Sequence, residues 1–305
     1  MGSFAEQLEQ RILLFDGAMG TTTHNHDLSL KDDYQGRENC PEILIQTHPD
    51  LVQSIHESFL AAGADAVETD TFGANKLVLG EFDLADRTVE LNSQAAQVAR
   101  AACEKYATGD RPRFVVGAIG PGMKLLTLGH TTWDQMFDSY VTQVRSLIRG
   151  GVDALLIETA QDLLQVKCAI NACIAALEDE STNPQTIPIM VQATIETTGS
   201  MLMGTQIAAA ATALRSFPII ALGLNCATAL PSHATTAKIT CGASTKEAFI
   251  TEGMRSTVSA SWTISQPNER MSWTTRSQID SPNGPASSSG YRPRHRRPGK
   301  KRETP

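Results

Sequence analysis

The sequence has no apolar run that approaches the roughly 20 residues needed to cross a bilayer. Its start, MGSFAEQLEQRILLF, lacks the long apolar core of a secretory signal peptide. Its six cysteines follow no spacing typical of a disulfide framework. These absences predict a soluble, cytoplasmic protein without a membrane partner, whose thiols stay reduced and available to a metal ion.

Positive charge is also scarce in the chain as a whole. The 305 residues carry a formal net charge of −7, which argues against a nucleic-acid partner because a polyanion needs cations to bind it. The charge is unevenly spread, since residues 1–228 are strongly acidic and residues 229–305 are basic. We therefore expect two parts that differ in kind, 1–228 and 229–305.

The second part, 229–305, is rich in Ser and Thr, keeps no hydrophobic period of a strand or a helix, and ends in YRPRHRRPGKKRETP. Such a composition buries too little apolar surface to offset chain entropy, so we expect an irregular, disordered tail. Two origins fit the abrupt change after LNCAT: a genuine basic tail, or an aberrant reading frame.

The first part alternates short apolar runs with longer stretches of helical period. The expected strands are ILLFD (12–16), DAVETD (65–70), FVVGAIG (114–120), DALLIET (153–159), IPIMVQATI (187–195) and PIIALGLNC (218–226). Because these runs are apolar throughout, they fit parallel strands that are covered on both faces. A doubly wound sheet and a (β/α)8 barrel both satisfy this pattern.

Polar residues fall at or just past the C-terminal ends of the expected strands. They are Asp16, Glu68, Asp70, Glu158 and Asn225. Barrel enzymes assemble a site from the ends of several strands, whereas open sheets usually bind a ligand in one crevice. The distribution favours an α/β fold of the (β/α)8 TIM-barrel type, incomplete, with about six β/α units within 1–228.

The first of these ends is FDGAMGTTT, residues 15–23, in which a carboxylate precedes a glycine-rich turn. Asp16 is suited to hold the ammonium group of an amino acid, while the backbone N–H groups of Gly17 and Ala18 hold its carboxylate. The alternative is a tight strand-to-helix turn without a ligand.

Two Glu-Thr pairs close apolar strands in VETDTFGAN (67–75) and LIETAQD (156–162). A buried carboxylate there needs a cation or hydrogen-bond donors, so Glu68 and Glu158 should have partners. A substrate ammonium and a structural salt bridge to a neighbouring strand fit equally well.

In GLNCAT, Cys226 ends the sixth expected strand. A single cysteine at this place is more often an inert buried thiol than a ligand. A catalytic zinc takes three protein ligands and leaves a fourth position open. The sequence offers no second cluster of thiols, and Cys241 and His233, the nearest further candidates, lie in the part without expected structure.

Five motifs occur in order between residues 11 and 228: LLFDGAMGTTT, HESFLAAGADAVETDTFGAN, GAIGP, GGVDALLIETAQDLLQVKCAI and GLNCAT. Together they resemble the homocysteine S-methyltransferase family, and within it most the N-terminal homocysteine-binding module of cobalamin-dependent methionine synthases. The resemblance implies a (β/α)8 barrel that transfers a methyl group to the zinc-activated thiolate of homocysteine and so forms methionine.

The resemblance also implies a set of site residues. It assigns Cys226 as the catalytic metal position and as one of three zinc-ligating cysteines, the other two forming a pair that has no counterpart here. It assigns substrate binding to Asp16, Gly17, Ala18 and Glu158, and places Glu68, Thr69, Thr71 and Asn75 at the rim of the barrel. Methylcobalamin, held by cobalamin or folate domains outside this chain, is the implied methyl donor, with betaine or S-methylmethionine as the donors of stand-alone relatives.

Three hypotheses of different classes follow. The first is the zinc-dependent methyltransferase module, and the second is a truncated, zinc-free homocysteine-binding remnant without catalysis. The third is a barrel-derived scaffold whose basic tail binds polyanions. Because an open six-stranded fragment exposes sheet edges, we also expect it to aggregate or to pack loosely unless a partner covers them.

Overall fold

The computed structural model describes residues 2–226, 238–239, 259–261 and 274–276. Five parallel strands form the main sheet: β1 (Ala66–Glu68), β2 (Phe114–Ile119), β3 (Ala154–Ala160), β4 (Ile189–Ala193) and β5 (Ile219–Leu224). β6 (Lys238–Ile239) pairs antiparallel with β5, and β7 (Ser259–Ser261) pairs with β8 (Thr274–Arg276) in a separate two-stranded sheet.

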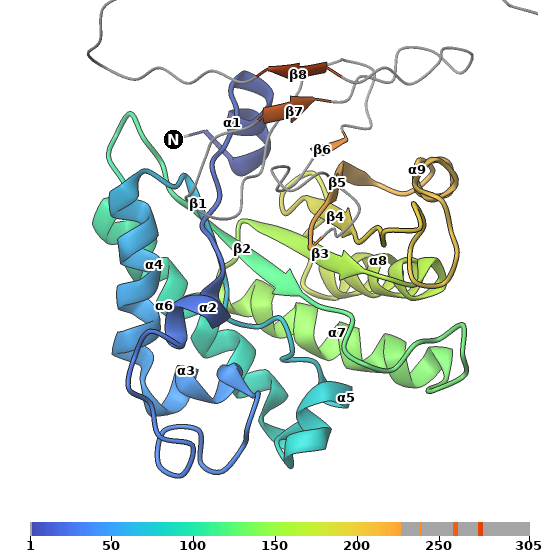
Figure 1. The fold of residues 1–305 in the computed structure, drawn as a ribbon. Coiled ribbons are helices and arrows are strands. Elements are labelled where there is room, and N and C mark those ends of the chain that lie inside the picture. The colour runs from blue at the N-terminus through green and yellow to red at the C-terminus, as the bar shows by residue number, and fades with distance from the viewer. Residues whose placement is uncertain (1, 227–237, 240–258, 262–273, 277–305) are drawn as a thin grey trace, which may run out of the picture.

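The strand order decides between the two fold classes. The main sheet runs β1-β2-β3-β4-β5, so each parallel strand pairs with the next one along the chain. A doubly wound sheet reverses its order at a switch point, whereas a barrel adds its strands in sequence. The described chain is therefore α/β with five consecutive parallel strands of a partial TIM barrel (Figure 1).

Helices precede or connect the strands, and the longest of them cover one face of the sheet (Figure 1). They are α1 (Phe4–Gln10), α2 (Met19–Thr23), α3 (Leu44–Thr47), α4 (Pro49–Ala62), α5 (Lys76–Leu79), α6 (Thr88–Tyr106), α7 (Trp133–Gly150), α8 (Leu163–Asp179) and α9 (Ile207–Leu214), with 3-10 turns at Pro41–Ile43, Gly80–Phe82 and Ala85–Arg87. No helix among the described residues combines the length and the apolar character that a membrane span requires.

Local sequence sets the ends of the long helices. Thr132 and Gln135 form a capping box at the start of α7, which satisfies two backbone N–H groups that the helix leaves without partners. α4 and α7 end at Gly63 and Gly151, which adopt φ values of 116° and 93°. Glycine takes this left-handed conformation without the penalty that a Cβ imposes, so both helices stop there and turn back to the sheet.

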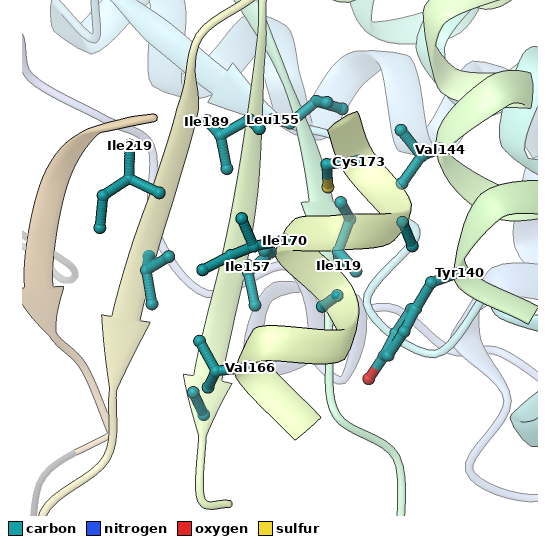
Figure 2. Close-up of a cluster of buried hydrophobic side chains, with 14 of the residues drawn as sticks. Ile119, Tyr140, Val144, Leu155, Ile157, Val166, Ile170, Cys173, Ile189 and Ile219 are labelled. Carbon is teal, nitrogen blue, oxygen red and sulfur yellow. The ribbon is translucent and has the colours of Figure 1, made fainter. Parts of the chain in front are cut away.

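The main hydrophobic core fills the space between the sheet and its helices. Alternate strand residues, such as Val115, Leu155 and Ile157, point toward α6, α7 and α8. Figure 2 shows Ile157 and Ile119 beside Val166, Ile170 and Tyr140 of α7 and α8. These side chains are buried, so this layer carries most of the hydrophobic stabilisation of the fold.

A second core occupies the opposite, inner face of the sheet. Its strand residues are Ala66, Phe114, Val116, Ala154, Leu156, Met190 and Ala221. Phe4 of α1 packs edge-on against Phe15 and Phe114, with ring centroids 6.3 and 5.4 Å away. Because Phe114 begins β2, α1 closes the inner face at the N-terminal ends of the strands.

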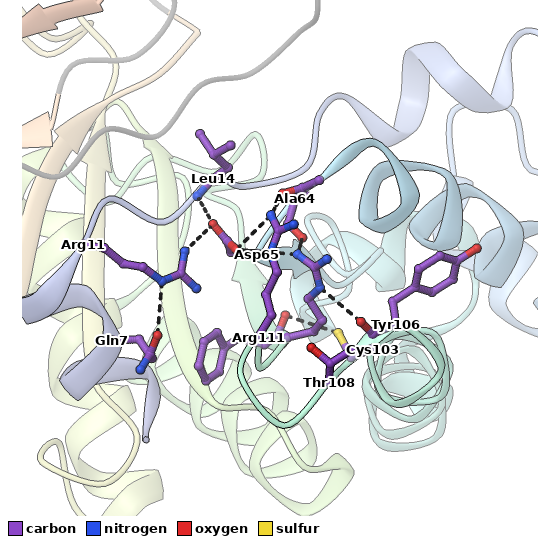
Figure 3. A network of polar contacts seen from close by, with 12 residues as sticks. Gln7, Arg11, Leu14, Ala64, Asp65, Cys103, Tyr106, Thr108 and Arg111 are labelled. Carbon is purple, nitrogen blue, oxygen red and sulfur yellow. Dashed lines mark hydrogen bonds and ion pairs between the residues drawn. The ribbon is translucent and has the colours of Figure 1, made fainter. Parts of the chain in front are cut away.

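The expectation of a strand over 12–16 was wrong in part. The structure assigns one isolated bridge, Phe15 to Ala66, although the segment lies beside β1 and exchanges backbone hydrogen bonds with it. The carboxylate of Asp65 accepts the N–H of Leu14 at 3.0 Å and pairs with Arg11 at 2.8 Å, as Figure 3 shows. Side-chain contacts therefore replace part of the backbone ladder that defines a strand.

The other five expected strands are present: four are shorter than expected, and β3 is shifted by one residue from the expected 153–159. The predictions for 229–305, including the recruitment of Cys241 or His233, lie outside the described residues apart from β6, β7 and β8.

Candidate active site at the C-terminal ends of the strands

Polar side chains replace apolar ones toward the C-terminal ends of the inner face. Two-residue alternation continues from Ala66 to Glu68 on β1, from Leu156 to Glu158 on β3 and from Met190 to Gln192 on β4. Glu158 and Gln192 are buried, and Glu68 is half-buried. Because all the strands are parallel, these side chains converge at one end of the sheet.

Asn225 joins this group from the loop after β5. Its Oδ1 accepts the backbone N–H of Thr159 at 3.0 Å, and its Nδ2 donates to Oε2 of Glu158 at 3.2 Å and to Oγ1 of Thr159 at 3.0 Å. Thr194, directly after β4, donates to the backbone carbonyl of Asn225 at 3.2 Å. Glu158 thus has an amide donor, and the hydrogen bonds of Asn225 join the end of β5 to the end of β3.

Cys226 follows directly and is exposed, so it is not buried, as a single cysteine at this place more often is. Cys40, Cys103, Cys168 and Cys173 are the buried thiols among the described cysteines. Burial raises the pKa of Cys40, Cys103 and Cys168 to about 12, which keeps these thiols protonated.

Thr159 and Cys226 share an uncommon backbone conformation, with φ values of 55° and 47°. A β-branched residue at positive φ is strained, and such strain persists where the surrounding structure enforces it. The Oγ1 of Thr159 lies 3.8 Å from the Sγ of Cys226, within range of a weak hydrogen bond to sulfur. These two residues thus place the thiol of Cys226 beside Thr159, at the C-terminal end of the inner face.

Asp16 lies at the same end of the sheet, just after the 12–16 segment. Its Oδ1 accepts the N–H of Glu68 at 3.0 Å, and its Oδ2 lies 3.7 Å from Nδ1 of His56 in α4. Burial raises the pKa of Asp16 above its ordinary value, while His56 and the N–H of Glu68 oppose that rise. Burial therefore favours the neutral acid, and an arriving cation would favour the carboxylate.

Gly17 and Ala18 continue from Asp16 into α2. Among the described residues, no hydrogen bond uses the backbone N–H of either one. Both residues are at least partly exposed. The turn therefore presents a carboxylate beside two amide donors, the arrangement that the sequence predicted for holding an amino acid.

Thr69, Thr71 and Asn75 lie behind the rim and organise its backbone. The hydroxyls of Thr69 and Thr71 are 2.6 Å apart, and they bind the N–H and the carbonyl of Ala118 at 3.0 and 2.8 Å. The Oδ1 of Asn75 caps α5 through the N–H groups of Leu77 and Val78. These side chains fix the loop after β1.

A buried acidic pair stands beneath this loop. The Oε1 of Glu42 accepts the N–H of Gly73 at 2.6 Å, and a Cβ at Gly73 would lie 2.5 Å from the same oxygen. Burial and the nearby Glu42 raise the pKa of Asp70 to about 8, and burial also raises the pKa of Glu42. The sequence marked Asp70 as a strand-end residue, but it did not reveal Glu42 as its neighbour.

A metal site needs more ligands than the described residues bring together. Among residues 2–226 and the three short strands, no three His, Cys, Asp or Glu side chains converge in a way that would hold a metal ion. The described residues alone therefore do not make up a three-ligand zinc site that includes Cys226.

The family model for homocysteine S-methyltransferases matches residues 13–281. This chain belongs to the homocysteine S-methyltransferase family. It is 45% identical to the methionine synthase of Mycobacterium tuberculosis over 221 residues, and 44% identical to that of Mycobacterium leprae over 223 residues. These alignments cover 72% and 73% of the chain but 18% of each methionine synthase, so the chain spans under a fifth of their length.

Solved structures agree on the fold. The homocysteine methyltransferase MmuM of Escherichia coli in its metallated form aligns with a TM-score of 0.59 and 22% identity, over 73% of this chain and 77% of MmuM. Its oxidised form gives a TM-score of 0.58, with 21% identity over 74% and 77% of the two chains. The predicted resemblance and the partial barrel are thus confirmed, and the family is one of methyltransferases that act on homocysteine.

Sequence reasoning missed three members of the site region: His56, Gln192 and Thr194. Because side chains alternate along a strand, the register of β4 places Gln192 and Thr194 on the same face as Met190. His56 lies in the helical stretch HPDLVQSIHESFLAAGA. The available signal was its position four residues after Val52 and four before Leu60, on the apolar face of the helix.

Proposed function

We propose that this chain is a homocysteine-binding methyltransferase module of the methionine synthase type, which transfers a methyl group to the sulfur of homocysteine to form methionine. The observation that carries the proposal is the position of Asp16, Glu158 and Cys226 at the same, C-terminal end of the sheet, together with the N–H groups of Gly17 and Ala18, which no described residue accepts. Membership of the family supports the reaction class.

The proposed site matches the three functional groups of homocysteine. The ammonium is bound by the carboxylates of Asp16 and Glu158, and the carboxylate is bound by the N–H groups of Gly17 and Ala18. With the amino-acid end held in this way, the thiol extends toward Cys226. Fixing the reacting sulfur lowers the entropic part of the barrier to methyl transfer. Glu68 contributes its backbone N–H, which holds Asp16.

Binding of the amino-acid end is tested by titration calorimetry with L-homocysteine. We expect Asp16→Asn and Glu158→Gln each to weaken binding at least about tenfold, since each removes a charge-assisted contact of about 1.5–3 kcal/mol. Asp138→Asn is the matched control, because Asp138 is exposed on α7, away from the strand ends. Unchanged affinity in both site variants would disprove the proposed binding mode.

Zinc enters the proposal through Cys226. We propose this thiol as a zinc ligand because it is exposed, strained and next to the substrate groups. A second candidate function is zinc-free binding of homocysteine without catalysis, because the proposed contacts of Asp16, Gly17, Ala18 and Glu158 with the amino-acid end need no metal ion. Zinc per chain in the wild type and in Cys226→Ser separates the two: about one zinc, lost in the variant, supports the methyltransferase, and none in either supports the binding module.

The methyl donor is proposed from the relatives. Identity of 45% to a methionine synthase supports methylcobalamin as the donor, presented by domains outside the aligned region. Mixing the chain with methylcobalamin and homocysteine, and separately with betaine or S-methylmethionine, tests this choice by the methionine that forms. Methionine formed from betaine or S-methylmethionine alone would overturn it.

A further inference from the structure

His56 is a buried ionisable side chain to which the proposed reaction assigns no role. It lies in α4, is 0% exposed, and neither of its ring nitrogens has a hydrogen-bond partner among the described residues. A buried polar group without a partner costs about 1–3 kcal/mol, and an apolar side chain of similar size would avoid that penalty. The polarity of the ring therefore needs a reason other than packing.

The ring faces one functional group of the site. Its Nδ1 lies 3.7 Å from Oδ2 of Asp16, and both side chains are almost fully buried. The other oxygen of Asp16 already accepts the N–H of Glu68. A hydrogen bond of this kind is about 2.7–3.2 Å long, so a closure of well under 1 Å would join His56 to the free side of the carboxylate.

We propose that His56 is a positioning residue that orients Asp16 and stabilises it as a carboxylate for the ammonium group of homocysteine, without itself touching the substrate. This inference rests on the proposed function, because it assigns to Asp16 the role of ammonium acceptor. It adds a residue from the outer helical layer to a site built at the strand ends.

The electrostatic surroundings of Asp16 support this role. Burial favours the neutral acid, which cannot pair with an ammonium ion, and His56 is the largest influence in the opposite direction. From α6, the thiol of Cys103 lies within electrostatic range of Asp16, but burial keeps that thiol protonated. From β1, Glu68 supplies its N–H, and its own carboxylate is a further acidic group one strand away. The further influences that lower the pKa of Asp16 are backbone N–H groups, that of Glu68 and its own.

Two substitutions separate positioning from packing. His56→Leu keeps most of the volume and removes the ring nitrogens, whereas His56→Asn keeps an N–H donor close to the Nδ1 position. We expect His56→Leu to weaken homocysteine binding about tenfold and His56→Asn about threefold or less. In an Asp16→Asn background, His56→Leu should change the affinity less than about twofold, because the group that it orients is already altered.

The pH dependence gives a readout that packing alone would not move. Without His56, the pKa of Asp16 should rise further, so the acidic limb of homocysteine binding should shift to higher pH in His56→Leu. Equal affinities and equal pH profiles for wild type and His56→Leu would overturn the inference. Equal losses of affinity in the Leu and Asn variants would also overturn it, since a structural role predicts no rescue by a donor.

A binding-independent measurement distinguishes this inference from the proposed function. The carboxyl carbon of Asp16 can be followed by NMR in aspartate-labelled protein and identified by its loss in Asp16→Asn. Absence of homocysteine binding by the wild type would count against the proposed function alone. A carboxyl titration midpoint that is the same in wild type and His56→Leu would count against the role of His56, and an upward shift in the variant would support it.

Discussion

The two ends of β1 treat a buried aspartate in opposite ways. Asp65, just before the strand, receives Arg11, Arg111 and the N–H of Leu14, and these contacts outweigh burial and hold its pKa below the ordinary value. Asp70, two residues after the strand, has no ion pair among the described residues, and burial together with the nearby Glu42 raises its pKa to about 8. The N-terminal end of the sheet is therefore arranged for stability, and the C-terminal end keeps buried groups incompletely paired.

The inner face repeats this division. Its N-terminal end is closed by Phe4 against Phe15 and Phe114, whereas its C-terminal end carries Glu158 and Asn225. In barrel enzymes, substrate binds at the C-terminal ends of the strands, and the opposite end contributes mainly stability. Substitutions at the two ends should accordingly affect different measurements.

The largest effect is expected at the apolar end. Phe4→Ala should lower the free energy of unfolding by about 3–5 kcal/mol, because it removes a buried ring and leaves a cavity between Phe15 and Phe114. Its homocysteine affinity should stay close to that of the wild type at temperatures where both are folded. Denaturant unfolding and calorimetry measure the two quantities, with Phe4→Leu as the control. If Phe4→Ala were as stable as the wild type but bound homocysteine poorly, the proposed division between a stabilising end and a binding end of the sheet would be wrong.

Asp65→Asn should come next, with a loss of about 3 kcal/mol, because Arg113 is buried beside this carboxylate and would lose a counter-charge. The pKa of Asp65 is lower in the folded state than its value of 3.8 in an unfolded chain. Its contribution is therefore present above pH 3.8 and is lost as the pH falls through the folded pKa. Unfolding curves at pH 7 and at about pH 3 should differ more for the wild type than for the variant. An equal change in stability between the two pH values in the wild type and in Asp65→Asn would contradict this stabilising role of the Asp65 carboxylate.

Asp70→Asn should have a smaller effect of the opposite sign. Because the folded pKa is raised, the folded state holds a proton that the unfolded state releases, so stability falls as the pH rises from 3.8 to about 8. Removing this carboxyl should stabilise the protein at pH 8 by about 1–2 kcal/mol and reduce the difference between pH 5 and pH 8. Denaturant unfolding at both values checks it, and a variant less stable than wild type at pH 8 would refute it.

The smallest effect is expected on the outer side of the 12–16 segment. Leu14 is 44% exposed and its neighbour Leu13 is 1% exposed. Leu14→Ala should change the free energy of unfolding by less than about 1 kcal/mol, whereas Leu13→Ala should lower it by about 2–5 kcal/mol. Thermal unfolding of this matched pair tests which side of the segment faces the inner core. Similar losses for both would show that the outer side is also packed.

Much of the fold could be predicted because strand runs, helix periods and glycine stops are local signals. Five of the six expected strands illustrate this. The segment 12–16 could not be judged from its residues, since its pairing depends on the side chain of Asp65. The same holds for the site: Asp16, Glu158 and Cys226 were predicted at strand ends, but the pairing of Asp16 with His56 requires the docking of α4 on the sheet.

The sequential strand order has a consequence for synthesis on the ribosome. Each of β2, β3, β4 and β5 pairs with the strand before it in the chain, so that partner has already emerged when the later strand is made. At about 5–20 residues per second, each β/α unit has seconds to settle before the next arrives. The Phe4 cluster can close once β2 is made, so the stable end of the sheet can assemble before Glu158 and Cys226 are translated. Folding during synthesis would thus assemble the apolar N-terminal end of the sheet before the site residues at its C-terminal end.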